Sequence, residues 1–326
     1  MAQTSSSALL NTFTNVIANE TLQLLQGNLV LSSFVGTPQT NQTTFTKGNT
    51  LDIVLDPVFT VSDARVDDTE RTYQTPTQNK ITLTLDYFKE VPARWTNLDQ
   101  VIADPALFAA KYGRNTAITL AAQIEKDIFS VALNDPAVPA GNEIGSDATA
   151  MNAKALRQIR QKFVEMNLPI MDSDIIVVVS PQQYSELLAD STITENQTRG
   201  DGLAIQTGRI GTAYGMTIIE SNYLPTNDNL SSVSGGNANP VGLAMVRGMS
   251  VGFAVRSLPA ETMGVGTSAS VSAGGYALRT RMWADPNVNQ FKMTTDVLYG
   301  IKTVGYPSLV DGAVKYPVLP ILGGVA

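Results

Sequence analysis

Two long stretches of the chain repeat apolar residues at the spacing of an α-helix. The first runs from Ser5 to Gln26 and stops before Gly27, a residue type that often follows the end of a helix. The second begins at Asp104-Pro105, where aspartate caps a helix and proline occupies its first position, and it continues to Asn134. A helix of that length spans roughly 45 Å. We therefore expect it to be the main strut of the molecule.

Between these helices the period of the pattern changes from helical to alternating. Residues Asn49–Asp56 and Lys80–Lys89 each place apolar side chains on one face only, which predicts a pair of strands. The segment 59–79 between them is polar and charged. Two strands alone are marginally stable, because they cannot bury both of their faces. We interpret the hairpin as an arm that has too little apolar surface to fold on itself and lies across a second copy of the chain.

The second half of the chain mixes both periods. A helix is predicted at Asn152–Asn167, and the β-branched run Ile175–Val179 is typical of a strand buried on both faces. Ser180-Pro181 then opens a helix that continues over Gln182–Ala189. Further strands are predicted at Met216–Glu220, Val241–Arg247, Ser250–Ser257, Tyr276–Met282, Phe291–Thr295 and Leu298–Val304, with a flexible loop or weak extended segment at Val265–Tyr276. Strands outnumber helices here, so the fold class is α+β rather than repeating βαβ.

The composition excludes several kinds of catalytic and metal-binding site. It contains no cysteine and no histidine, which removes disulfides, thiolate metal sites, Ser-His-Asp triads and histidine-ligated metals. Its net charge of −7 argues against general binding to phosphates. No secretory signal or membrane-spanning run is present in the sequence, so we expect no membrane partner. We predict no catalytic residue, no metal site and no cofactor.

The candidate functional residues are charged side chains on and near the predicted arm. Arginine can hold a carboxylate of a neighbouring molecule through paired hydrogen bonds. An exposed arginine without such a partner contributes only a fraction of a kcal/mol, and the two readings have equal weight. The residues predicted to make contacts between subunits are Lys47, Arg65, Asp68, Glu70, Arg71, Lys89 and Arg94.

Three short motifs, taken with the order of elements, resemble one protein family. Ile175–Tyr184 resembles a strand-to-helix step, Gly208–Gly215 followed by Met216–Pro225 resembles a glycine turn leading into a strand and an S-N-x-L-P run, and Tyr299–Lys302 resembles a closing strand. Together they are similar to the major capsid protein of tailed double-stranded DNA bacteriophages. The resemblance in layout covers nearly the whole chain.

The resemblance implies a Hong Kong 97-type capsid fold and a division into five parts. These are an N-terminal arm and helix at 1–36, an extended E-loop hairpin at 37–91, a peripheral domain with the long spine helix at 92–150, an axial domain at 151–260, and returning strands shared by both domains at 261–326. It also implies hexamers and pentamers in an icosahedral head enclosing double-stranded DNA without sequence-specific binding. Implied partners are a scaffolding protein, a portal and a decoration protein, and the head is assembled in the host cytoplasm.

Two alternatives stay open from the sequence. The same fold can form an encapsulin-like bacterial nanocompartment that encloses a cargo enzyme. A carboxylate-based hydrolase such as a glycosidase would instead need a pair drawn from Asp172, Asp174, Glu186 and Glu220.

Overall fold

The computed structural model divides the chain into two compact units. It describes residues 6–29, 31, 34–35, 48–57, 59, 61, 73–75, 79–96, 105–136, 138, 143–145, 150–168, 170, 174–194, 210–225, 241–260, 266–285, 287, 290–310 and 312–322. Unit 1 comprises Met1–Leu51, Leu83–Ile128 and Gly252–Lys302, and unit 2 comprises Asp52–Thr82, Phe129–Val251 and Thr303–Ala326. Each unit is therefore assembled from segments that are distant in the sequence.

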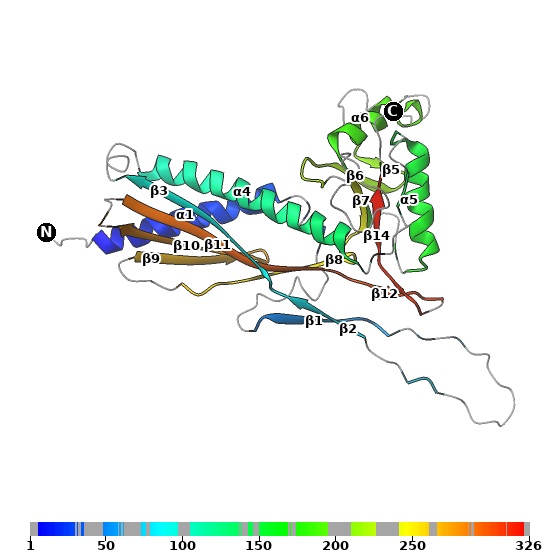
Figure 1. Cartoon of the computed structure of the whole chain (residues 1–326), viewed down its shortest axis with the longest axis horizontal. Helices are drawn as coiled ribbons and strands as arrows, with labels where there is room; N and C mark the ends of the chain where they lie inside the picture. The colour runs from blue at the N-terminus through cyan, green and yellow to red at the C-terminus, as the bar shows by residue number, and fades with distance from the viewer. Residues whose placement is uncertain are drawn as a thin grey trace. The chain divides into compact units, whose positions relative to one another are not determined.

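Unit 1 is built on an antiparallel sheet in the strand order β3-β11-β10-β9, with β8 also paired to β11 (Figure 1). The strands are β3 (Tyr87–Thr96), β8 (Val251–Arg256), β9 (Gly266–Ala273), β10 (Tyr276–Asp285) and β11 (Gln290–Thr303). The register pairs Met282 with Met293, so both side chains lie on the same face of the sheet.

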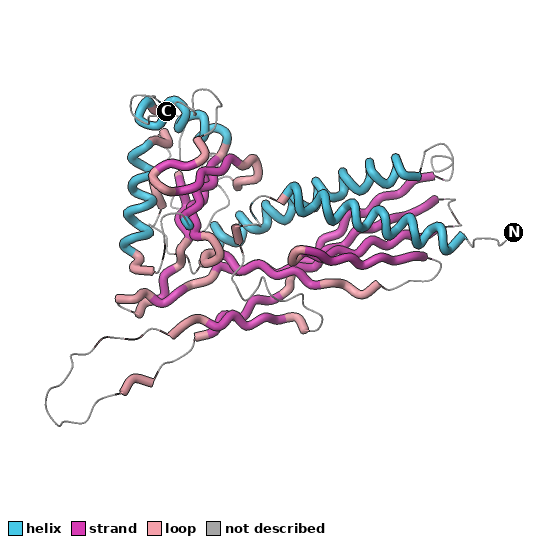
Figure 2. The backbone as a smooth tube through the Cα atoms, turned by 180° about the vertical axis from the view of Figure 1, so that it is seen from behind, coloured by secondary structure: helices cyan, strands magenta, loops and turns pink. Residues whose placement is uncertain are grey.

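Two helices, α1 (Ser6–Asn28) and α4 (Pro105–Asn134), lie side by side along one face of this sheet (Figures 1 and 2). Ile17 of α1 is buried in one cluster with Met282 and Met293. The helices approach closely at Gly113, where an added Cβ would lie 3.1 Å from the Thr21 hydroxyl oxygen. Glycine inside α4 thus allows the two helices to approach closely, and both predicted helices are confirmed.

Unit 2 contains a mixed sheet in the order β14-β7-β4-β6-β5. Its strands are β4 (Ile175–Val179), β5 (Thr212–Ala213), β6 (Met216–Glu220), β7 (Gly242–Val246) and β14 (Val318–Ile321). All five residues of β4 are buried, as the β-branched run predicts, and β4 runs parallel to β6 and antiparallel to β7. A short hairpin, β12 (Tyr306–Pro307) with β13 (Val314–Lys315), belongs to the same unit.

The helices of unit 2 are α5 (Ala153–Glu165), α6 (Pro181–Ala189) and α7 (Ser191–Thr194). Ser180 caps α6 through its side chain, which accepts a hydrogen bond from the Gln183 backbone N–H, while the Gln183 side chain accepts one from the Ser180 N–H. Asn152 caps α5 through its side-chain oxygen, which accepts hydrogen bonds from the backbone N–H groups of Lys154 and Ala155. Apolar side chains of α5, α6 and β4 form one core cluster. No helix in the part of the chain that the structure describes is long and apolar enough to cross a membrane.

The hairpin differs from its prediction in two respects. Its strands are β1 (Thr50–Val54) and β2 (Lys80–Thr84), and the run predicted to continue to Lys89 breaks, because β3 starts at Tyr87 and joins the sheet of unit 1. The apolar face of the pair is buried within its own chain, with Ile53 and Leu83 at 0% exposure. The expectation that these strands need a second copy to cover them is therefore wrong for the base of the hairpin.

Strand pairing corrects one further prediction and decides between two readings of another. The strands expected at Phe291–Thr295 and Leu298–Val304 are one continuous strand, β11. Of the two readings of Val265–Tyr276, the extended one is confirmed, because the segment forms β9, which pairs with β10 along its whole length. The glycine run before Met216 leads through a turn into β6, as predicted, and does not open a helix.

Candidate assembly surfaces

The structure places only some of the predicted contact residues. Lys47, Arg65, Asp68, Glu70 and Arg71 lie outside the described residues. Lys89 and Arg94 both lie on β3. Because they are five residues apart on a strand, their side chains point to opposite faces of the sheet.

Lys89 faces the helices and is engaged within its own chain. Its Nζ lies 3.3 Å from Oδ2 of Asp127 on α4 and 5.7 Å from the centroid of the Tyr87 ring. The hydroxyl of buried Tyr299 donates to the same Asp127 oxygen at 2.5 Å, and the Tyr299 ring stacks on Tyr87. Burial, followed by the hydrogen bond to Asp127, raises the pKa of Tyr299 above its usual value. Lys89 thus helps to hold α4 against the sheet.

Arg94 is exposed on the face of the sheet away from the helices, directly across from Lys292 of β11. On the same face, Asp296 is fully buried and forms ion pairs with Arg279 at 2.8 Å and Arg281 at 2.9 Å. Two guanidinium groups share the carboxylate of Asp296, and the register places Glu90 of β3 opposite Asp296 on the same face. Arg94 therefore remains available, by position and charge, for contact with a carboxylate of another molecule.

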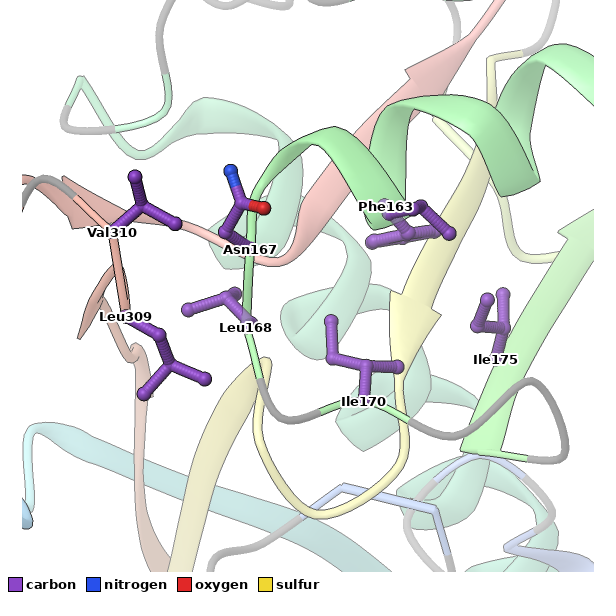
Figure 3. Close-up of a pocket in the computed structure, with 8 residues that line it drawn as sticks. Phe163, Asn167, Leu168, Ile170, Ile175, Leu309 and Val310 are labelled. Atoms are coloured by element: carbon purple, nitrogen blue, oxygen red, sulfur yellow. The ribbon is translucent and has the colours of Figure 1, made fainter.

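An apolar groove in unit 2 was not predicted from the sequence. It has a volume of about 310 Å³ and lies beside the end of α5 (Figure 3). Apart from Asn167, the residues that line it are apolar: Phe163, Val164, Leu168, Ile170, Ile175, Leu309 and Val310. We call it the α5 groove. Val310 is 74% exposed, and Val164 and Leu309 are exposed beside it, so the rim is apolar and open to water.

The rim of the α5 groove is held in place by backbone hydrogen bonds. Leu309 N–H donates to the Asn167 carbonyl oxygen at 3.0 Å, which ties the tip of the β12–β13 hairpin to the turn after α5. Asn167 has a φ of 51°, in the left-handed region that asparagine tolerates better than most residues. Ser308 N–H donates to the Ala313 carbonyl oxygen at 2.9 Å and closes the tip. The apolar rim is thus preformed.

Among the carboxylates of the hydrolase alternative, Asp174 and Glu220 do not form a catalytic pair in the described residues. Glu186 accepts a hydrogen bond from the Met151 backbone N–H at 2.6 Å, so its carboxylate helps to fix the chain before α5. The β4–β6 register pairs Val179 with Glu220, so Asp174 and Glu220 lie near opposite ends of parallel strands, roughly 16 Å apart. Paired glycosidase carboxylates lie about 5–10 Å apart. Asp172 lies outside the described residues.

A comparison with known protein families identifies the family of the chain that carries these surfaces. The profile of the family described as "Phage capsid protein" matches residues 93–306, more than half of the chain. This chain belongs to the phage capsid protein family. No curated protein matches the capsid protein in sequence. The predicted resemblance to phage major capsid proteins is therefore confirmed, and the capsid protein is a structural component of an oligomeric virion shell.

Solved structures with the same fold support this assignment. A structure from Mycobacterium phage Che8 aligns with a TM-score of 0.58 and 18% identity over 90% of this chain and 90% of that chain. The capsid of Ralstonia phage GP4 aligns at 0.57 and 12% identity over 89% of each chain. A virus-like particle from Pyrococcus furiosus aligns at 0.51 and 9% identity over 94% of this chain and 97% of that chain. At these low identities the structural alignments show the fold, and the capsid protein has the Hong Kong 97-type fold.

Proposed function

We propose that copies of the capsid protein assemble into pentamers and hexamers that close an icosahedral phage head around double-stranded DNA. The observation that carries this proposal is the match to the phage capsid family over residues 93–306. The fold agrees, because its neighbours include phage capsids that cover nearly the full chain. DNA is enclosed without sequence-specific contacts, in keeping with the net charge of −7.

The shell requires each subunit to present two different surfaces that fit each other. Head-to-tail contacts of this kind generate closed rings when the rotation between subunits closes. Many modest contacts made simultaneously then give a stable shell. We assign the arm in 37–91 to one of these surfaces, with Lys47, Arg65, Asp68, Glu70, Arg71 and Arg94 as its charged contact residues and Lys89 at its base.

The remaining parts take the roles that the fold suggests. Residues 92–150 and the strands returning from 261–326 form the peripheral domain with the spine helix α4, and residues 151–260 form the axial domain. A scaffolding protein directs assembly in the host cytoplasm, a portal occupies one vertex, and a decoration protein binds the finished head. Each of these partners is a separate part of the proposal.

Assembly of the purified protein tests the proposal directly. The full chain is produced alone and together with a candidate scaffolding protein, and the products are viewed by negative-stain electron microscopy. Closed shells of uniform diameter are expected. A protein that stays monomeric by light scattering under all of these conditions would refute the proposal. Shells filled with a protein cargo and free of DNA in the producing cell would instead favour the nanocompartment alternative.

A further inference from the structure

We propose that Lys111, Arg114 and Lys126 on the exposed face of α4 bind the phosphate backbone of the enclosed DNA. The inference rests on the proposed function, which supplies the duplex, and it adds the surface of the subunit that touches it. It is carried by the separation of opposite charges across α4, by the polar surroundings of the three basic residues, and by the uneven distribution of charge between the two units.

Helix α4 has its basic and acidic residues on different sides. Its charged residues are Lys111, Arg114, Glu125, Lys126 and Asp127, and the three basic ones are exposed to water. The carboxylate of Glu125 is buried and accepts a hydrogen bond from the Leu31 backbone N–H at 3.2 Å. Asp127 is turned toward the sheet and engaged by the ion pair and the hydrogen bond described above. Both carboxylates of α4 are thus occupied within the chain, while its three cations face water.

The three basic side chains form a stripe on the side of α4 that points away from the sheet. Lys111 precedes Asp127 by sixteen residues, which turns it about 160° from the side that meets the sheet. Arg114 and Lys126 lie within about 60° of Lys111 around the helix, and the stripe is roughly 22 Å long. Duplex DNA carries one phosphate charge per about 1.7 Å of its axis, so a stripe of this length meets phosphates whatever the base sequence. We call it the α4 stripe.

The surface beside the α4 stripe suits DNA better than a protein partner. Helix α1, which lies next to α4 (Figure 2), exposes the amide side chains of Asn15, Asn19 and Gln23. Such amides donate hydrogen bonds to phosphate oxygens. The only charged residue of α1 is Glu20, so the exposed faces of the two helices keep an excess of positive charge. Surfaces that bind DNA are more polar and more positive than protein interfaces, whose cores are depleted of charge.

The net charge of −7 does not oppose this contact, because unit 2 carries it. Unit 1, which contains the α4 stripe, has 11 basic and 10 acidic residues, whereas unit 2 has 11 basic and 19 acidic ones. Salt screens exposed charges beyond about 8 Å at physiological ionic strength, so the local excess of positive charge decides the contact. Each phosphate that is neutralised releases counterions, and the contribution is repeated in every copy of the shell.

Acetylation of lysines tests the contact in the assembled head. DNA-filled heads, heads emptied of DNA and shells that still contain scaffolding protein are treated briefly with N-hydroxysuccinimide acetate, and the modified residues are quantified by mass spectrometry. We expect acetylation of Lys111 and Lys126 to be at least fivefold slower in filled heads than in emptied ones. The control is Lys154, an exposed lysine of α5, whose rate should change less than twofold.

The outcomes separate this inference from the proposed function. Equal rates at Lys111 and Lys126 in filled and emptied heads, or equal protection of Lys154, would overturn the DNA contact and leave the capsid role intact. Protection only in shells that contain scaffolding protein would overturn it in favour of a protein occupant. Failure of the unsubstituted protein to form shells would overturn the capsid role and the DNA contact with it.

Removal of the charges gives a second measurement. In one variant the three basic residues of the α4 stripe are replaced by glutamine, and in its control Lys154→Gln, Arg157→Gln and Arg160→Gln remove the same charge from the exposed side of α5. Shells are sonicated to expose both faces and pelleted with a labelled duplex at low salt. The α4 variant should bind the duplex at least tenfold more weakly than the natural protein, and the control less than twofold. Electron microscopy verifies that both variants form shells, and equal losses would contradict the proposed contact.

Discussion

The base of the arm depends on one glycine in β11, and replacing it is the most direct test of how the hairpin is seated. A Cβ added at Gly300 would lie 2.4 Å from the Thr84 carbonyl oxygen and 2.7 Å from a methyl carbon of Leu83. Ordinary contact begins near 3.4 Å, so Gly300→Ala requires a shift of about 1 Å. One obstacle is backbone, which cannot rotate away.

The cost follows from this overlap. Inserting a methyl group into a packed site typically destabilises by about 1–3 kcal/mol. The loss of glycine's freedom in the unfolded chain returns about 0.4–1 kcal/mol when the backbone conformation suits alanine. We therefore expect Gly300→Ala to lower the free energy of unfolding of the unassembled subunit by about 1–2 kcal/mol, measured by urea denaturation.

Gly27→Ala is the matched control, because a Cβ at Gly27 meets nothing within 4 Å and the residue lies in α1. It should stabilise the subunit by about 0.5–1 kcal/mol, the usual gain of alanine over glycine in a helix. If Gly300→Ala proved as stable as the natural protein, or gained as much as Gly27→Ala, the close seating of the hairpin base would be refuted.

Two further predictions concern the contacts of buried tyrosines. Asp127→Ala should lower the free energy of unfolding by about 1–3 kcal/mol, because it leaves the buried Tyr299 hydroxyl without its acceptor. Lys89→Ala should lower it by less than about 1 kcal/mol, because it removes only a partly exposed ion pair. Equal losses for the two variants in thermal melts would contradict this. Burial raises the pKa of Tyr306 to about 12, so the folded state keeps a proton that the unfolded state loses above pH 10, and stability should fall from pH 10 to 12. Tyr306→Phe should reduce that fall in unfolding curves, and an unchanged pH profile would count against it.

The elements that the sequence predicted well carry strong local signals. The Asp104-Pro105 start and the turn after Asn134 predicted α4, which spans Pro105–Asn134. The run Ile175–Val179 matches β4 at both ends. Caps, proline and continuous β-branched runs act within a few residues, so they can be read without knowing what packs around them.

The elements that were missed depend on distant partners. β9, which the sequence left open between a loop and an extended segment, is rich in serine and alanine, and it is a strand because it pairs with β10 and lies against α1. The two strands predicted in place of β11 leave out Asp296 and Val297, where the run of strand residues is interrupted by a charge. In the structure Arg279 and Arg281 neutralise it inside the sheet.

Only part of the candidate site could be predicted from the sequence, because the groove also depends on residues that are distant in the chain. A charged arm can be recognised from its composition, but the groove combines the end of α5 with the tip of the β12–β13 hairpin, more than 130 residues later. Two adjacent apolar residues in a turn, Leu309-Val310, were the only local signal. The burial of the hairpin base was also hidden, because it depends on the space that Gly300 leaves for Leu83.

The space at Gly300 fixes the position of the hairpin base. Since Leu83 fits where Gly300 has no side chain, the backbone at Thr84 lies directly against β11. A side chain at position 300 would push that backbone away from β11, and it would thereby shift the point at which the hairpin leaves the sheet.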